Sequence, residues 1–160
     1  MTAGTLAFRA IRKPRSATRP GVWQYVLKGD AWTVLASPVI YSTIVPLVLL
    51  DAWVTVYQAI CFRLWKITRA RRRDYFALDR HRLAYLNGIE KVNCLFCSYA
   101  NGVFGYVREV AARTEQYWCP IRHGRRIRPP HGRYASFVPY GDEGRYRERL
   151  PALRAALRRK

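Results

Sequence analysis

Acidic residues and cysteines are scarce in this sequence. It has 10 Asp and Glu against 29 Lys and Arg, so its formal net charge is +19, and only 4 of its 160 residues are cysteines. So few cysteines exclude a disulfide-stapled scaffold. The excess of positive charge predicts a polyanionic partner, either anionic lipid head groups or nucleic acid. Because 14% of the residues are aromatic and half are hydrophobic, a disordered chain is not expected.

Familiar catalytic patterns are also missing. The sequence has no phosphate-binding loop, nucleophile elbow, zinc-peptidase helix or dinucleotide fingerprint. Its glutamates do not form the Glu-x-x-His pairs of di-iron bundles. No catalytic residue is therefore predicted, and nothing favours an enzyme. Residues 1–30 lack an apolar run long enough for a cleavable signal sequence, so we expect a basic N-terminal arm there.

Charged residues are absent from residues 31–50, "AWTVLASPVIYSTIVPLVLL". A helix of this length crosses a hydrocarbon core of roughly 30 Å. Trp32 and Tyr41 are typical of membrane interfaces, and membrane helices tolerate Pro38 and Pro46. This segment therefore predicts a membrane-inserted helix.

The continuation of this segment, to residue 73, has two interpretations. In the first, Asp51 caps an amphipathic basic helix that lies along the membrane interface. In the second, residues 31–62 form a re-entrant helical hairpin that breaks between Pro46 and Asp51. Both place a membrane segment plus an amphipathic basic helix within residues 31–73.

Residues 74–123 are expected to form a small helical domain. Asp79 can cap its first helix, and residues 96–117 follow with an apolar residue every three or four positions. Gly102 and Gly105 would allow another helix to approach closely. Residues 124–160 predict a basic tail with a C-terminal helix from about Asp142. The chain is therefore expected to be mainly α-helical.

Three of the four cysteines belong to short Cys/His clips. Cys94 and Cys97 form C-x2-C, and Cys119 and His123 form C-x3-H. Such Cys3His sets hold tetrahedral zinc, and iron in a thiolate-rich site is the chemical alternative. The sequence therefore predicts a metal site made by these four residues.

The spacer between the two clips leaves other interpretations open. An unbroken helix would hold the clips roughly 30 Å apart, so they would meet in one chain only if the helix breaks near Asn101-Gly102. Without a break, each clip needs another protein or a second copy of the chain. A redox-active C-x-x-C dithiol and plain structural thiols are the remaining alternatives.

The strings "NCLFCSYANG" and "EQYWCPI" carry a resemblance. With residues 30–140 around them, they resemble a family of small, uncharacterised bacterial membrane proteins. The resemblance implies bacterial origin and membrane association, but no reaction. Basic residues are more frequent after the apolar segment than before it, which favours a cytoplasmic C-terminal part at the inner membrane.

Partners follow from this placement. Anionic lipid is the first expected partner, since arginines beside a membrane segment usually contact head groups. A partner protein or a homodimer would complete the metal site. Nucleic acid, bound through the Arg-rich tail, is the least favoured.

Overall fold

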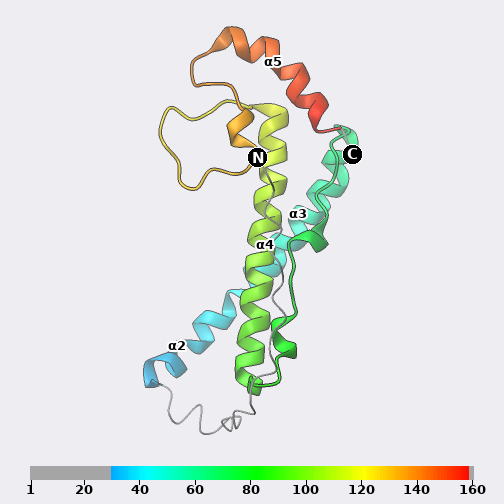
Figure 1. Cartoon of the computed structure of the whole chain (residues 1–160). Helices are drawn as coiled ribbons and strands as arrows, with labels where there is room; N and C mark the ends of the chain where they lie inside the picture. The colour runs from blue at the N-terminus through cyan, green and yellow to red at the C-terminus, as the bar shows by residue number, and fades with distance from the viewer. Residues whose placement is uncertain (1–29, 159–160) are drawn as a thin grey trace.

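Figure 1 shows the computed structural model, which describes residues 30–158. All but the last residue of the predicted basic arm, 1–30, and the chain end, 159–160, lie outside the described residues. The described part is mainly helical, as expected. Its helices are α2 (Ala31–Ser42), α3 (Ile44–Leu64), α4 (Gly88–Trp118) and α5 (Glu143–Ala156), with short 3-10 turns η1 (Arg72–Asp74), η2 (Arg80–Arg82) and η3 (Tyr134–Ser136).

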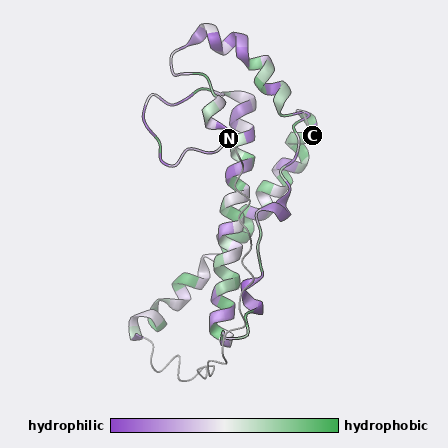
Figure 2. Ribbon diagram, in the orientation of Figure 1, coloured by the Kyte–Doolittle hydropathy of each residue, from purple (hydrophilic) through white to green (hydrophobic). Residues whose placement is uncertain are grey.

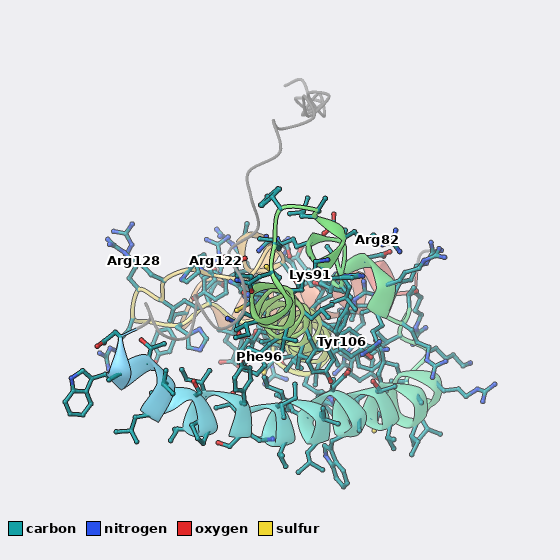
Figure 3. The ribbon with its side chains drawn as sticks, turned by 90° about the horizontal axis from the view of Figure 1, so that it is seen from below. Arg82, Lys91, Phe96, Tyr106, Arg122 and Arg128 are labelled. Carbon is teal, nitrogen blue, oxygen red and sulfur yellow. The ribbon has the colours of Figure 1, made fainter. Side chains whose placement is uncertain are left out.

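Helices α2 and α3 join into one apolar helix, Ala31–Leu64. Thr43, between them, keeps helical backbone angles, so the two form an almost straight rod (Figure 3). The local interruption is explained by Pro46, because its ring nitrogen cannot donate to the carbonyl of Ser42. Helix α3 continues through Asp51. The predicted hairpin is therefore wrong, and Asp51 caps no helix.

Helix α3 ends in a Schellman motif. Ile67 N–H donates to the Phe62 carbonyl at 2.8 Å, and Lys66 N–H donates to the Arg63 carbonyl at 3.3 Å. The side chains of Phe62 and Ile67 are buried in the core and supply the hydrophobic contact of the motif. Lys66 has a positive φ of 56°, where glycine is the usual residue. The chain thus turns sharply and returns toward the start of α4.

Helix α4 is uninterrupted and about 46 Å long. It begins in a capping box, in which Asn87 Oδ1 accepts from Glu90 N–H at 2.9 Å and Glu90 Oε2 accepts from Asn87 N–H at 2.8 Å. The predicted cap at Asp79 precedes only the turn η2. The expected first helix of this domain is thus replaced by a loop. The other expected helix, near Asp142, is confirmed as α5, which Asp142 caps.

The core lies where the end of α3, the segment after it, the middle of α4 and the end of α5 meet. Its buried members are Phe62, Ile67, Ala70, Tyr106, Val110 and Leu157. The glycines of α4 are closely approached by a loop and not by the expected helix, because Phe76 packs on Gly102 and Tyr75 packs on Gly105. The core therefore takes residues from segments far apart in the chain.

The molecule has two sides. Seen nearly along α4, the apolar helix crosses one side, and the other described elements lie on the opposite side (Figure 3). Phe96 and Tyr106 lie between α4 and the apolar helix, whereas Arg82 and Lys91 lie beyond α4. Figure 2 shows hydrophilic residues prevailing on α5 and the loop before it. One long side of the apolar helix is therefore left without a protein neighbour.

Candidate functional site

The structure places the four predicted metal ligands at opposite ends of α4. Cys94 and Cys97 lie one turn apart in its first third, Cys119 is its C-cap residue and His123 lies in the loop beyond. At 1.5 Å per residue, the two clips are roughly 30 Å apart. The helix has no break near Asn101 that would let the clips meet in one chain, and the Asn101 amide donates to the Cys97 carbonyl at 2.8 Å within the helix.

Local contacts hold His123 of the second clip in place. The Tyr134 hydroxyl accepts from His123 N–H at 2.6 Å, and the two rings stack with centroids 5.9 Å apart. Burial raises the pKa of the Cys119 thiol, and the nearby Glu115 carboxylate raises it further. Since electrophiles react with the thiolate, this shift lowers the reactivity of the Cys119 thiol toward them.

Among residues 30–158, no group of three or more His, Cys, Asp or Glu side chains is arranged to hold a metal ion. All four cysteines are free thiols. The metal site at Cys94, Cys97, Cys119 and His123 therefore stays a prediction, in the form that needs a second chain. The alternatives of iron and of a C-x-x-C dithiol also stay predictions.

The inner face of the apolar helix, which packs against the rest of the protein, holds Asp51, which was expected to cap a helix. Asp51 is buried, and its carboxylate accepts from Arg72 at 3.1 Å (Nε to Oδ1) and 2.5 Å (Nη2 to Oδ2). The Tyr99 hydroxyl donates to Asp51 Oδ2 at 3.0 Å. This two-pronged contact neutralises the only acid within the apolar helix. Its signal in the sequence was a lone carboxylate in an apolar run, which requires a partner.

Further polar contacts join the apolar helix to the rest of the protein, among them the hydrogen bond that the Tyr41 hydroxyl donates to Asn93 Oδ1 on α4. Gln58 is buried, and its amide pairs with the backbone of Ala70, accepting at 2.6 Å and donating at 3.3 Å. It also donates to the Tyr106 hydroxyl at 3.0 Å. Tyr57 and Thr114 hydroxyls lie 2.9 Å apart. Each polar group on this face is thus satisfied by the protein itself.

The outer face of the apolar helix is uncovered. Its side chains recur every three or four residues on either side of the Ser42–Pro46 stretch, and each is more than half exposed: Trp32, Leu35, Val39, Leu49, Trp53, Val56, Ile60 and Leu64. We call these eight residues the outer stripe. The stripe has no charged member and runs the length of the helix, about 50 Å.

An apolar groove adjoins this helix. It has a volume of about 390 Å³ and lies between α3 and α4, where Val54, Val107 and Trp118 are among its lining residues. Its lining joins side chains of the two helices where they diverge. The uncovered apolar surface thus continues from the stripe into the angle between α3 and α4.

Comparison with known proteins identifies no relative of this chain. Neither the family models, nor the curated proteins, nor the solved structures give a match for this chain. The resemblance to bacterial membrane proteins, drawn from "NCLFCSYANG" and "EQYWCPI", therefore stays a prediction.

Proposed function

We propose that this protein is a membrane-anchored module that attaches through the apolar helix and contacts anionic lipid through its basic residues. The observation that carries the proposal is the exposure of that helix. It is long and apolar enough to enter a bilayer, yet only 6% of its most apolar window is buried. The core helix of a soluble protein would be largely covered instead.

The outer stripe favours lipid as the covering partner. Eight large apolar side chains in one line form an exposed patch of a kind that soluble monomers rarely show. Their transfer into hydrocarbon would contribute on the order of 10 kcal/mol. Trp32 and Trp53, both about three-quarters exposed, suit the head-group level.

The contacts of the inner face favour a helix that lies along the membrane instead of crossing it. Asp51 sits near the middle of the apolar helix and holds Arg72 beside it. If the helix crossed the bilayer, this guanidinium and its neighbours Arg71 and Arg73 would lie at mid-membrane depth, at a high cost in free energy. If the helix lies in the interface, the outer stripe faces the acyl chains and Arg72 stays on the protein side.

The charge of the chain specifies the lipid. The net charge of +19 is attracted to an anionic lipid surface and gains no such attraction from a neutral one. Arg63 and Lys66 stand at the end of the apolar helix, where they would meet phosphates of an anionic leaflet. We further propose the inner membrane of a bacterium, with the domain after the helix on the cytoplasmic side. If the four Cys and His residues bind a metal ion, they would do so in a dimer of this module.

Vesicle flotation tests the attachment. We expect Trp53→Glu to lower binding to vesicles with anionic lipid by tenfold or more, since it places a charge in the outer stripe. Phe104→Glu is the control, because Phe104 is also more than half exposed but lies on α4. Equal binding by both variants and the wild type would contradict the proposal.

Labelling depth tests the orientation. Leu35→Cys, Leu49→Cys and Ile60→Cys, each in a background with the native cysteines replaced by serine, can carry an environment-sensitive fluorophore. Quenchers fixed at different depths in the lipid should then report similar depths for the three positions. A deep position 49 with shallow positions 35 and 60 would show a crossing helix and would refute the in-plane orientation alone.

A further inference from the structure

A large cavity opens where the end of α3, the segment after it and the end of α5 meet. Its volume is about 870 Å³. Its apolar floor is built by Phe62, Ile67 and Leu157, which belong to the core. A backbone hydrogen bond of 2.9 Å from Thr68 N–H to the Leu157 carbonyl ties the two walls together. The floor of the cavity is therefore part of the buried core.

Its walls carry an unusual concentration of positive charge. Arg113 and Arg133 line it but share Glu109, with N to O distances of 2.8 and 2.7 Å. The remaining cations of the lining are Arg63, Lys66, Arg69, Arg71 and Arg158. We call these five residues the cation cluster. None of them belongs to an ion pair within residues 30–158.

Little negative charge in the cavity opposes the cluster. Asp74 is the acidic residue of the lining, and it lies 3.8 Å from Arg73. The carboxyl ends of α3 and α5 add a partial negative charge of about one half each. Together these leave several exposed positive charges uncompensated around the cavity, so its electrostatic potential attracts anions.

Lys66 adds a second indication. It is the residue with a positive φ in the Schellman turn, where glycine would avoid the clash of a Cβ atom. A side chain held in such a conformation points to a role that outweighs its strain. Lys66 is one of the residues that line the cavity, so its positive charge is available there.

We propose that the cavity binds a small phosphate-containing compound whose phosphate groups carry two or more negative charges. Arginine guanidinium groups match phosphate oxygens in pairs, and five unpaired cations would balance a doubly or multiply charged ligand. The phosphate belongs either to a lipid head group, reached from the adjacent end of the apolar helix, or to a soluble compound. The first source rests on the proposed membrane attachment, and the second does not.

Calorimetric titration of the full chain in neutral detergent tests the cavity. The ligands are pyrophosphate and a short-chain phosphatidic acid, with sulfate for comparison. We expect Arg69→Gln/Arg71→Gln to weaken binding of the phosphate ligand about 10- to 100-fold. The charge-matched control is Arg125→Gln/Arg126→Gln in the exposed loop, which should change binding by less than about twofold. An equal loss in both double variants, or no binding of either phosphate ligand, would overturn the proposal.

Further measurements distinguish a lipid head group from a soluble phosphate compound, and they test the cavity independently of the membrane attachment. Tighter binding of phosphatidic acid than of pyrophosphate assigns a lipid head group, and the reverse assigns a soluble ligand. Lys66→Gly should raise the melting temperature and weaken phosphate binding, whereas stronger binding would refute a role for its ammonium group. Trp53→Glu should keep pyrophosphate binding while losing vesicle binding, so either proposal can fail without the other.

Discussion

Single residues on α4 determine how closely the neighbouring loop approaches. A Cβ atom at Gly102 would lie 2.7 Å from Phe76 Cδ1, whereas one at Gly105 would lie 3.3 Å from Tyr75 Cδ1. The first distance is shorter than side-chain carbons tolerate, so the ring of Phe76 would have to move. Because Phe76 packs against the core, this movement disturbs the contact between the loop and α4.

Gly102→Ala is therefore expected to lower the free energy of unfolding by about 1–3 kcal/mol, despite the better helix propensity of alanine. Gly144→Ala is the matched control, since Gly144 also lies in a helix but has open space around it. It should raise the free energy of unfolding by about 0.5–1 kcal/mol. Chemical denaturation in detergent measures both, and equal gains would show that Phe76 makes no close contact.

At the scale of elements, Glu109 ties α4 to the loop after it. Its carboxylate accepts from Arg113 on the same helix and from Arg133 in the loop. Burial alone would raise the pKa of Glu109, but the hydrogen bonds and charges of Arg133 and Arg113 outweigh burial and hold the pKa below its ordinary value of 4.5. A lowered pKa stabilises the folded state above the ordinary value, and the stabilisation is lost as the pH falls through the folded pKa.

Glu109→Gln should accordingly lower the free energy of unfolding by about 1–2 kcal/mol at pH 7. This difference from the wild type should shrink as the pH falls below about 4.5. Glu143→Gln is the control, because Glu143 pairs with Arg147 on the exposed surface of α5. Its effect should be under about 0.5 kcal/mol at either pH. Denaturant midpoints of the variants and the wild type at pH 7 and pH 4 measure these effects. A Glu109→Gln difference in stability that is the same at both pH values would contradict the ion-pair explanation.

At the scale of the whole molecule, the length of α4 determines what the cysteines can do. The helix separates the C-x2-C clip from the C-x3-H clip, so under the metal hypothesis one chain would present two half-sites. Two chains with antiparallel α4 helices would bring unlike halves together at both ends. The metal hypothesis therefore predicts zinc binding that is coupled to dimerisation, with one ion per chain.

Complementation tests this coupling. Cys97→Ser and Cys119→Ser should each lose zinc and zinc-dependent dimerisation. A mixture of the two variants should recover one site per dimer, since one variant keeps an intact C-x2-C clip and the other an intact C-x3-H clip. Sedimentation with metal analysis measures both quantities. A wild-type protein that stays folded, monomeric and metal-free would refute the four-ligand site.

The predictability of the fold from the sequence differed between elements. Helix α5 and its cap at Asp142 were predicted because acidic residues at the start of a helix and basic residues at its end are local signals. The cap at Asp79 was wrong because Asn87 and Glu90 close a complete capping box, which a lone aspartate does not match. The position of Asp51 was also misjudged, since its partner Arg72 is 21 residues away in the chain.

The amino-acid sequence by itself determined the mainly helical fold, the uncharged segment and the large positive charge, because composition and periodicity are local properties. Only the tertiary structure decided which side of the apolar helix is covered. The polar Gln58 is buried against the protein, while the apolar Trp53 and Ile60 are exposed. Periodicity distinguishes two faces of a helix, but contacts with distant segments decide which face is inside. The same long-range contacts gather the cation cluster around one cavity.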